Sequence, residues 1–192
     1  PAWLIGPPVP RDYRPVDHHG AVRHGVYPGS FDPPTLAHLA VADAARRRHG
    51  LDRVVWTLSL HPLGKERGRT TVEERRTVLD QVATDHAWLE VNVVDARLVA
   101  DLADGYDVVV MGADKWHQLH DPSFYEDGAV MAEALSRLPT CAVAPRDGLE
   151  VPREALLEVP RWVARQSSTA AATAEPWTML SAARSSGLWD GS

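Results

Sequence analysis

The sequence contains a single cysteine, Cys141, among its 192 residues. One thiol cannot form an internal disulfide, and Cys141 lies in the apolar stretch 140–144, which is typical of a buried strand rather than a reactive site. A chain of this length buries a sufficient core without disulfides or bound metals. We therefore expect a domain that folds in a reducing, cytoplasmic setting.

Long apolar runs and long runs of like charge are also missing. The sequence has no apolar stretch of about eighteen residues, and no basic start followed by an apolar core, so it predicts neither a membrane span nor a secretory signal. The net charge is −6, and like charges gather only in the short run Arg46–Arg48. Because the broad basic surface expected of a protein that binds duplex nucleic acid is lacking, we expect a small-molecule partner, no nucleic acid and no membrane.

Residues 1–20 are rich in proline and follow neither a strand nor a helix period, which predicts an extended N-terminal arm before a domain spanning 21–192. From there on, apolar residues alternate between strand and helix patterns. The predicted strands are 21–27, 53–60, 88–94, 106–111 and 140–144, and the predicted helices are 35–49, 72–84, 97–103 and 128–138. A further helical pattern, 169–184, should be broken or restarted by Pro176. This alternation predicts an α/β, Rossmann-like fold, a doubly wound parallel sheet of about five strands.

The loop after the first strand is the place to look for a site, because ligands of doubly wound sheets lie beyond the carboxyl ends of the strands. Gly29 permits close backbone approach, and Asp32 is expected to cap the next helix. Pro33 and Pro34 suit the first helical turn, whose amide groups would then face the cleft as an anion site.

Thr35 and His38 are three residues apart and share one face of that turn. The whole run 25–39, GVYPGSFDPPTLAHL, resembles the signature of the HxGH nucleotidyltransferase superfamily, which includes nicotinate mononucleotide and phosphopantetheine adenylyltransferases. The family pattern is G-[ST]-F-D-P followed by [HT]-x-G-H. Thr35 stands at the first position of the second half, as in phosphopantetheine adenylyltransferases, and Ala37 stands where glycine is usual.

The resemblance continues to about residue 172. The run 61–65, HPLGK, is similar to the family's lysine-bearing loop, and 71–75, TVEER, is similar to its S-x-E-E-R helix start. The run 110–114 with Trp116 resembles the G-A-D segment of mononucleotide adenylyltransferases. The run 167–169 matches the first half of I-S-S-T-x-x-R.

This resemblance implies a nucleotidyltransferase that transfers AMP from ATP to a small phosphate-bearing acceptor, with Mg²⁺ carried on the triphosphate. It implies that His38 contacts the α-phosphate or the bridging oxygen, that Thr35 helps to orient the phosphate, and that Lys65 holds phosphate charge. The residues implied to bind the nucleotide or the outgoing pyrophosphate are Tyr27, Gly29, Ser30, Phe31, Gly112, Asp114, Ser167, Ser168 and Thr169. No metal-ligating residue is implied.

Ala172 departs from the pattern, because the family's second motif ends in arginine. Either Arg165, Arg184 or Arg67 supplies the missing cation, or the enzyme is slow or inactive. Loss of one cation from a phosphate clamp costs about 2 to 4 kcal/mol of transition-state stabilisation.

Several acceptors and roles stay open. The run 112–114 with Trp116 favours nicotinate or nicotinamide mononucleotide, although no Y-T-x-x-T-L pattern occurs between residues 92 and 104. Phosphopantetheine fits 27–32, Thr35 and 96–100, but the R-G-[LI]-R of that family is missing at 112–114. A cytidylyltransferase is disfavoured because R-T-x-G-[IV]-S-T-[ST] is missing, and Ala37 with Ala172 motivates a catalytically degenerate nucleotide-binding protein. The sequence leaves homo-oligomer formation open.

Overall fold

The computed structural model describes residues 22–60, 70–96 and 98–190. Five strands form one sheet in the order β3-β2-β1-β4-β5, and every neighbouring pair is parallel. The strands are β1 (His24–Pro28), β2 (Arg53–Ser59), β3 (Leu89–Val94), β4 (Val108–Gly112) and β5 (Thr140–Ala144). The predicted α/β doubly wound sheet is confirmed, and the predicted arm over 1–20 lies outside the described residues.

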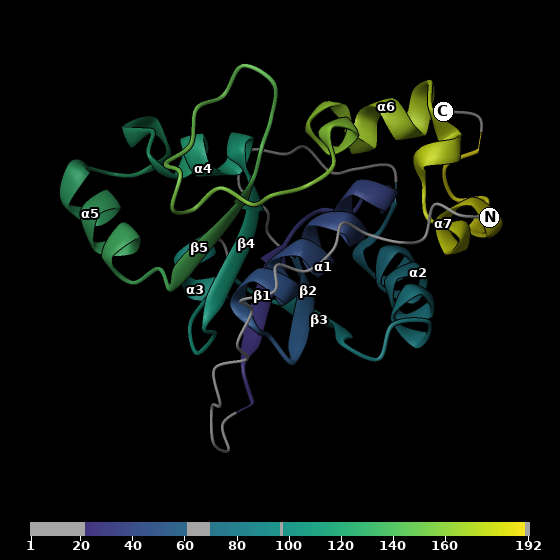
Figure 1. Cartoon of the computed structure of the whole chain (residues 1–192), viewed down its shortest axis with the longest axis horizontal. Coiled ribbons are helices and arrows are strands. Elements are labelled where there is room, and N and C mark those ends of the chain that lie inside the picture. Colours follow the sequence, from purple (N-terminus) through teal and green to yellow (C-terminus); the bar gives the residue numbers. More distant parts are fainter. Residues whose placement is uncertain (1–21, 61–69, 97, 191–192) are drawn as a thin grey trace, which may run out of the picture.

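Helices cover both faces of the sheet (Figure 1). They are α1 (Leu36–His49), α2 (Val72–Thr84), α3 (Val99–Leu102), α4 (Ala113–Leu119), α5 (Gly128–Ser136), α6 (Ser168–Thr173) and α7 (Ser181–Ser186), with short 3-10 turns η1 (Pro122–Phe124), η2 (Arg161–Arg165) and η3 (Pro176–Thr178). The apolar residues of α1 and α2 pack on one face, and those of α3, α4 and α5 pack on the other.

The alternation of side chains along each strand explains this two-sided core. Successive residues of a strand point to opposite faces, so Trp56 and Leu58 of β2 lie under α1 and α2, whereas Val109 and Met111 of β4 lie under the opposite layer. The strands therefore read as nearly continuous apolar runs, as expected for a parallel sheet buried on both faces. Cys141 of β5 is half-buried, and burial raises the pKa of its thiol.

The C-terminal segment agrees with the break predicted at Pro176. The pattern over 169–184 is broken at Pro176 as expected, into α6, η3 and α7, and this segment packs on α2 (Figure 1). Sequence reasoning missed α4, whose residues directly follow β4.

Within the described part of the chain, no helix is both long enough and apolar enough to cross a membrane.

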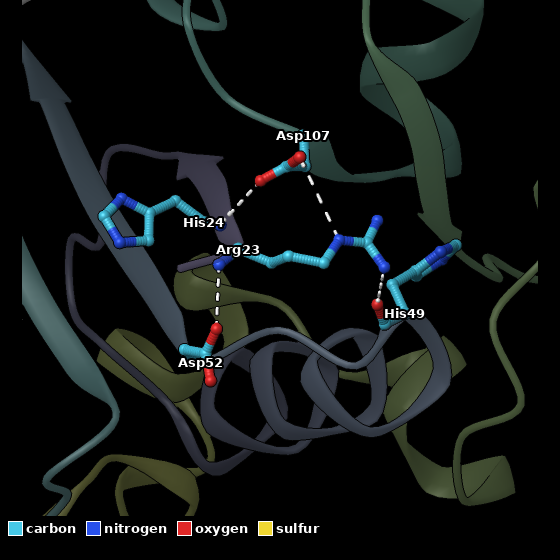
Figure 2. A network of polar contacts seen from close by, with 5 residues as sticks. All are labelled: Arg23, His24, His49, Asp52 and Asp107. Carbon is cyan, nitrogen blue, oxygen red and sulfur yellow. Dashed lines mark hydrogen bonds and ion pairs between the residues drawn. The ribbon is translucent and has the colours of Figure 1, made fainter. Parts of the chain in front are cut away.

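At the amino end of the sheet, polar groups tie the starts of three strands together (Figure 2). The backbone N–H of Arg23 donates to Asp52 (2.8 Å), and that of His24 donates to Asp107 (2.8 Å). The Arg23 guanidinium donates to the carbonyl of His49 (2.7 Å) and lies 3.9 Å from the Asp107 carboxylate. These contacts fix the entry of the chain into β1, β2 and β4.

Candidate active site

A cleft opens at the carboxyl ends of the strands, between β1 and β4. The strand order reverses there, and doubly wound sheets bind ligands at this switch point. Its lining comes from β1, the first turn of α1, the ends of β4 and β5, and the segment before α6. The lining residues are Tyr27, Thr35, Ala37, His38, Val41, Gly112, Ala144, Pro145, Arg146, Val163, Gln166, Ser167 and Ser168.

The loop after β1 is shaped around Phe31, which is fully buried and has a φ of 45°. Its ring stacks on Trp56, with centroids 4.8 Å apart, and lies 5.0 Å from the ring of His38. A side-chain carbon at Gly29 would lie 2.9 Å from the Phe31 ring, which is closer than real contacts allow. Glycine at position 29 therefore lets the loop close over a buried ring that supports His38.

Asp32 does not cap α1, and this prediction is wrong. The N-cap of α1 is Thr35, and Pro33 and Pro34 precede the helix rather than forming its first turn. Asp32 instead accepts hydrogen bonds from Thr70 (2.8 Å) and from the indole N–H of Trp189 (2.7 Å). Asp32 therefore makes charge-assisted hydrogen bonds to distant parts of the chain in place of the expected local cap.

A buried cation holds the same loop from α2. Arg75, only 8 % exposed, donates to the carbonyl of Ser30 at 2.6 Å. Burial lowers the pKa of Arg75, and the Asp32 carboxylate acts in the opposite direction. Arginine keeps its charge in proteins, so the contact persists across the physiological pH range.

The chain after η3 braces the loop from the other side. Thr35 and Met179 form an antiparallel β-bridge, and the N–H of Leu180 donates to the carbonyl of Pro34 at 3.0 Å. Together with Trp189, these contacts make the site's geometry depend on residues far along the sequence.

Thr35 and His38 both line the cleft and also contact each other. The backbone N–H of Thr35 donates to Nδ1 of His38 at 3.0 Å, and the Thr35 hydroxyl lies 2.9 Å from the same nitrogen. Since a backbone N–H can only donate, Nδ1 is an acceptor and the neutral ring carries its proton on Nε2. The tautomer needed for a donor on Nε2 is therefore set by the helix start itself.

The opposite wall carries a charge pair that follows β4 and β5. Nε of Arg146 lies 3.6 Å from a carboxylate oxygen of Asp114, and the Arg146 guanidinium also donates to the carbonyl of Gln166. Burial raises the pKa of Tyr27 far above its ordinary value, with Arg146 acting to lower it and Asp114 to raise it. A side-chain carbon at Gly112 would collide with the Asp114 carboxylate.

The segment before α6 closes the cleft. Gln166 is buried, and its amide oxygen accepts from the N–H of Ala37 at 3.1 Å, so one amide of the predicted anion site is already occupied. Ser167 is the N-cap of α6 and accepts from the N–H of Ala170 at 3.1 Å. The segment before α6 therefore contacts both walls, because Gln166 also accepts from the guanidinium of Arg146 through its carbonyl.

The structure brings part of the predicted site together. Tyr27, Thr35, His38, Gly112, Ser167 and Ser168 line the cleft. Asp114 joins it through Arg146, whereas Gly29, Ser30, Phe31 and Thr169 do not line it, and Lys65 lies outside the described residues. Arg146 and Gln166 were missed, although the rule that ligands lie beyond strand ends would have pointed to Arg146.

The candidates for the missing cation are placed elsewhere. Ala172 packs against the apolar cluster of α2 and the C-terminal segment. Arg165 is 82 % exposed and pairs with Asp147 at 3.2 Å, Arg184 is exposed, and Arg67 lies outside the described residues.

Comparisons with known proteins agree with this architecture. A family model described as cytidylyltransferase-like matches residues 26–139, more than half of the chain. The chain is 34% identical over 76 residues to a probable nicotinate-nucleotide adenylyltransferase of Bordetella pertussis, covering 40% of this chain and 39% of that protein. It is 35% identical over 74 residues to a phosphopantetheine adenylyltransferase of Natranaerobius thermophilus, covering 38% and 43%. The chain thus spans about two fifths of the length of these two relatives.

Among solved structures, the chain is similar to the Plasmodium falciparum nicotinic acid mononucleotide adenylyltransferase complexed with NaAD. The TM-score is 0.62 at 14% sequence identity, and the match covers 88% of this chain and 98% of that one. At this identity the likeness establishes the fold.

Proposed function

The chain belongs to the cytidylyltransferase-like family, and from that premise we propose that it transfers AMP from ATP to nicotinate or nicotinamide mononucleotide and releases pyrophosphate. The observation that carries this proposal is the cleft at the strand-order switch, where Thr35 and His38 face Ser167 and Ser168. Several relatives bear the name probable nicotinate-nucleotide adenylyltransferase, which supports the choice of acceptor.

The proposed reaction is an in-line displacement. An oxygen of the acceptor phosphate forms a bond to the α-phosphorus, the bond from that phosphorus to the bridging oxygen breaks, and pyrophosphate leaves with the electron pair. The enzyme's task is to position the two substrates and to stabilise the charge that develops. His38 donates from Nε2 to the α-phosphate, and Thr35 fixes the ring that does so.

The remaining predicted contacts belong to the same proposal. Ser167 and Ser168 contact the outgoing pyrophosphate, Lys65 holds phosphate charge, and Tyr27, Gly112 and Asp114 contact the nucleotide. Gly29, Ser30 and Thr169 lie close to these residues in the sequence but do not line the cleft. Phe31 is fully buried, so we assign it to packing beneath His38. Magnesium enters with the nucleotide as Mg·ATP, where it neutralises phosphate charge. We place the protein in the cytoplasm, without a nucleic-acid partner, and leave its oligomeric state to measurement.

Phosphopantetheine is the second candidate acceptor. Thr35 and the match to the Natranaerobius thermophilus enzyme favour it. A degenerate nucleotide-binding protein is the third reading, motivated by Ala37 and Ala172.

One experiment separates these readings. Pyrophosphate release is measured with ATP and CTP against nicotinate mononucleotide, nicotinamide mononucleotide and phosphopantetheine, and each product is identified by its mass. We expect release with ATP and a pyridine mononucleotide. Release confined to phosphopantetheine or CTP contradicts the proposal, and ATP binding without any release indicates the degenerate protein.

A further inference from the structure

The described residues that line the cleft carry little positive charge, although a triphosphate carries several negative charges. Among the described residues that line it, Arg146 is the only lysine or arginine. Ala172, where the family has arginine, does not line the cleft and packs against the apolar cluster that contains Val78 and Trp189. An arginine at 172 would therefore have to leave an apolar cluster before it could reach a phosphate.

Arg146 comes from a different element, the chain just after β5, yet it lies beside the proposed machinery. It lines the same cleft as His38, Ser167 and Ser168. Its guanidinium donates to the carbonyl of Gln166, the residue immediately before the two serines. The backbone thus holds the cation next to the segment that is proposed to contact pyrophosphate.

The partner of Arg146 is easily displaced. The Asp114 side chain is 65% exposed, and an ion pair with so much solvent around it is weak. A polyphosphate offers more charge and allows bidentate hydrogen bonds to the guanidinium. Asp114 can therefore hold Arg146 in place without competing strongly once a nucleotide arrives.

The free space in the cleft is small. Its volume is about 20 Å³, enough for roughly one water molecule. A triphosphate is larger than this space, so we expect side chains that line the cleft to move when it binds.

We propose that Arg146 is the cation that binds the triphosphate and the outgoing pyrophosphate, in place of the arginine missing at position 172, and that Asp114 holds it in the empty cleft. This proposal rests on the proposed function, since it assigns a residue to the same site. Arg146 supplies charge from the wall formed by β4 and β5, opposite the α1 wall that carries His38.

The test measures binding first. Inorganic tripolyphosphate and ATP are titrated calorimetrically into the unmodified protein and into Arg146→Ala, Arg146→Gln and Arg146→Lys, each checked for an unchanged unfolding midpoint. We expect the Ala and Gln variants to bind about tenfold more weakly or worse, and the Lys variant to retain part of the affinity because it keeps charge without the fork. Asp114→Asn should bind tripolyphosphate more tightly.

Three further variants sharpen the assignment. Arg137→Ala removes an ion-paired arginine that does not line the cleft and should bind like the unmodified protein. Arg165→Ala tests the competing cation and should also have no effect. Ala172→Arg should not improve binding or turnover.

The two proposals can fail separately. Equal binding by Arg146→Ala and the unmodified protein overturns the role of Arg146, as does failure of the unmodified protein to bind either probe. If binding depends on Arg146 but no acceptor yields pyrophosphate, the proposed function fails and the role of Arg146 stands. If AMP transfer occurs with the same kcat and KM in Arg146→Ala, the function stands and the role of Arg146 fails.

Discussion

The two ends of the sheet use polar groups differently. At the amino end, Arg23 and its partners bind one another and tie three strand starts together (Figure 2). At the carboxyl end, His38 and Arg146 are held by neighbours but face a cleft. Polar groups at the amino end fix the entry of the chain into the strands, whereas those at the carboxyl end line a cleft. Substitutions at the two ends should therefore alter different measurements.

The largest contrast is expected from His38→Ala at the carboxyl end. A donor aimed at developing phosphate charge acts mainly in the transition state, so turnover should fall by at least about a hundredfold while the protein still folds. Steady-state kinetics and circular dichroism check both parts. His24→Ala, a histidine replacement at the amino end, is the matched control and should keep full turnover. Retained activity in His38→Ala would remove His38 from the mechanism.

A smaller effect is expected from Trp189→Phe, which keeps a ring in the buried position but deletes the donor to Asp32. Hydrogen bonds to charged groups contribute about 1.5 to 3 kcal/mol, and the unfolding free energy should fall by that order. Turnover should fall as well, because Asp32 belongs to the loop that leads into Thr35 and the first turn of α1, where His38 lies. Denaturant titration and kinetics measure both.

The control for this change is Trp177→Phe, since Trp177 is 63% exposed. Its unfolding free energy should stay within about 0.5 kcal/mol of the unmodified value. An unchanged stability in Trp189→Phe would show that the tie between Asp32 and Trp189 does not support the loop.

The smallest effect is expected on the pH dependence of stability, through the titration of His49 at the amino end of the sheet. Burial, then Arg48 and Arg23, lower the pKa of His49, and its buried Nε2 has no hydrogen-bond partner in the described structure. The unfolded chain therefore takes up the proton more readily than the folded protein as the pH falls. Stability from this group is complete above the ordinary pKa of 6.5 and declines as the pH drops from there through the lower folded value.

His49→Gln removes this titration. We expect the unmodified protein to lose slightly more stability than His49→Gln between about pH 7.5 and 5.5, and the difference should be small because the residue is partly exposed to solvent. Urea titrations at several pH values provide the measurement, and kcat at pH 7.5 should be the same in both proteins. Parallel pH profiles of stability would contradict the assignment.

The sequence predicted what depends on local periodicity. Apolar alternation located β2, α2 and β5 closely, and the first motif located the loop that carries His38. It missed α4, because Asp114, Lys115, His117 and Gln118 leave too few apolar positions to show a helical period.

The contacts that complete the site could not be predicted, because they join residues far apart in the chain. Arg146 reaches Gln166 across 20 residues, and Asp32 meets Trp189 rather than the nearby helix start. The local sequence favours Asp32 as a helix cap, but Asp32 makes tertiary hydrogen bonds instead. The burial of Phe31 likewise depends on Trp56 from the neighbouring strand.

The tie between Asp32 and Trp189 also has a consequence for synthesis of the protein. The two residues are 157 positions apart in the sequence. At about 5 to 20 residues per second, a ribosome makes Asp32 roughly 8 to 30 seconds before the residue that will hold it. During that interval β1, α1 and β2 can already be present on the nascent chain, while the loop between them lacks its brace. The sheet can therefore begin to assemble during translation, but the binding loop acquires its final shape only after the segment containing Trp189 has emerged.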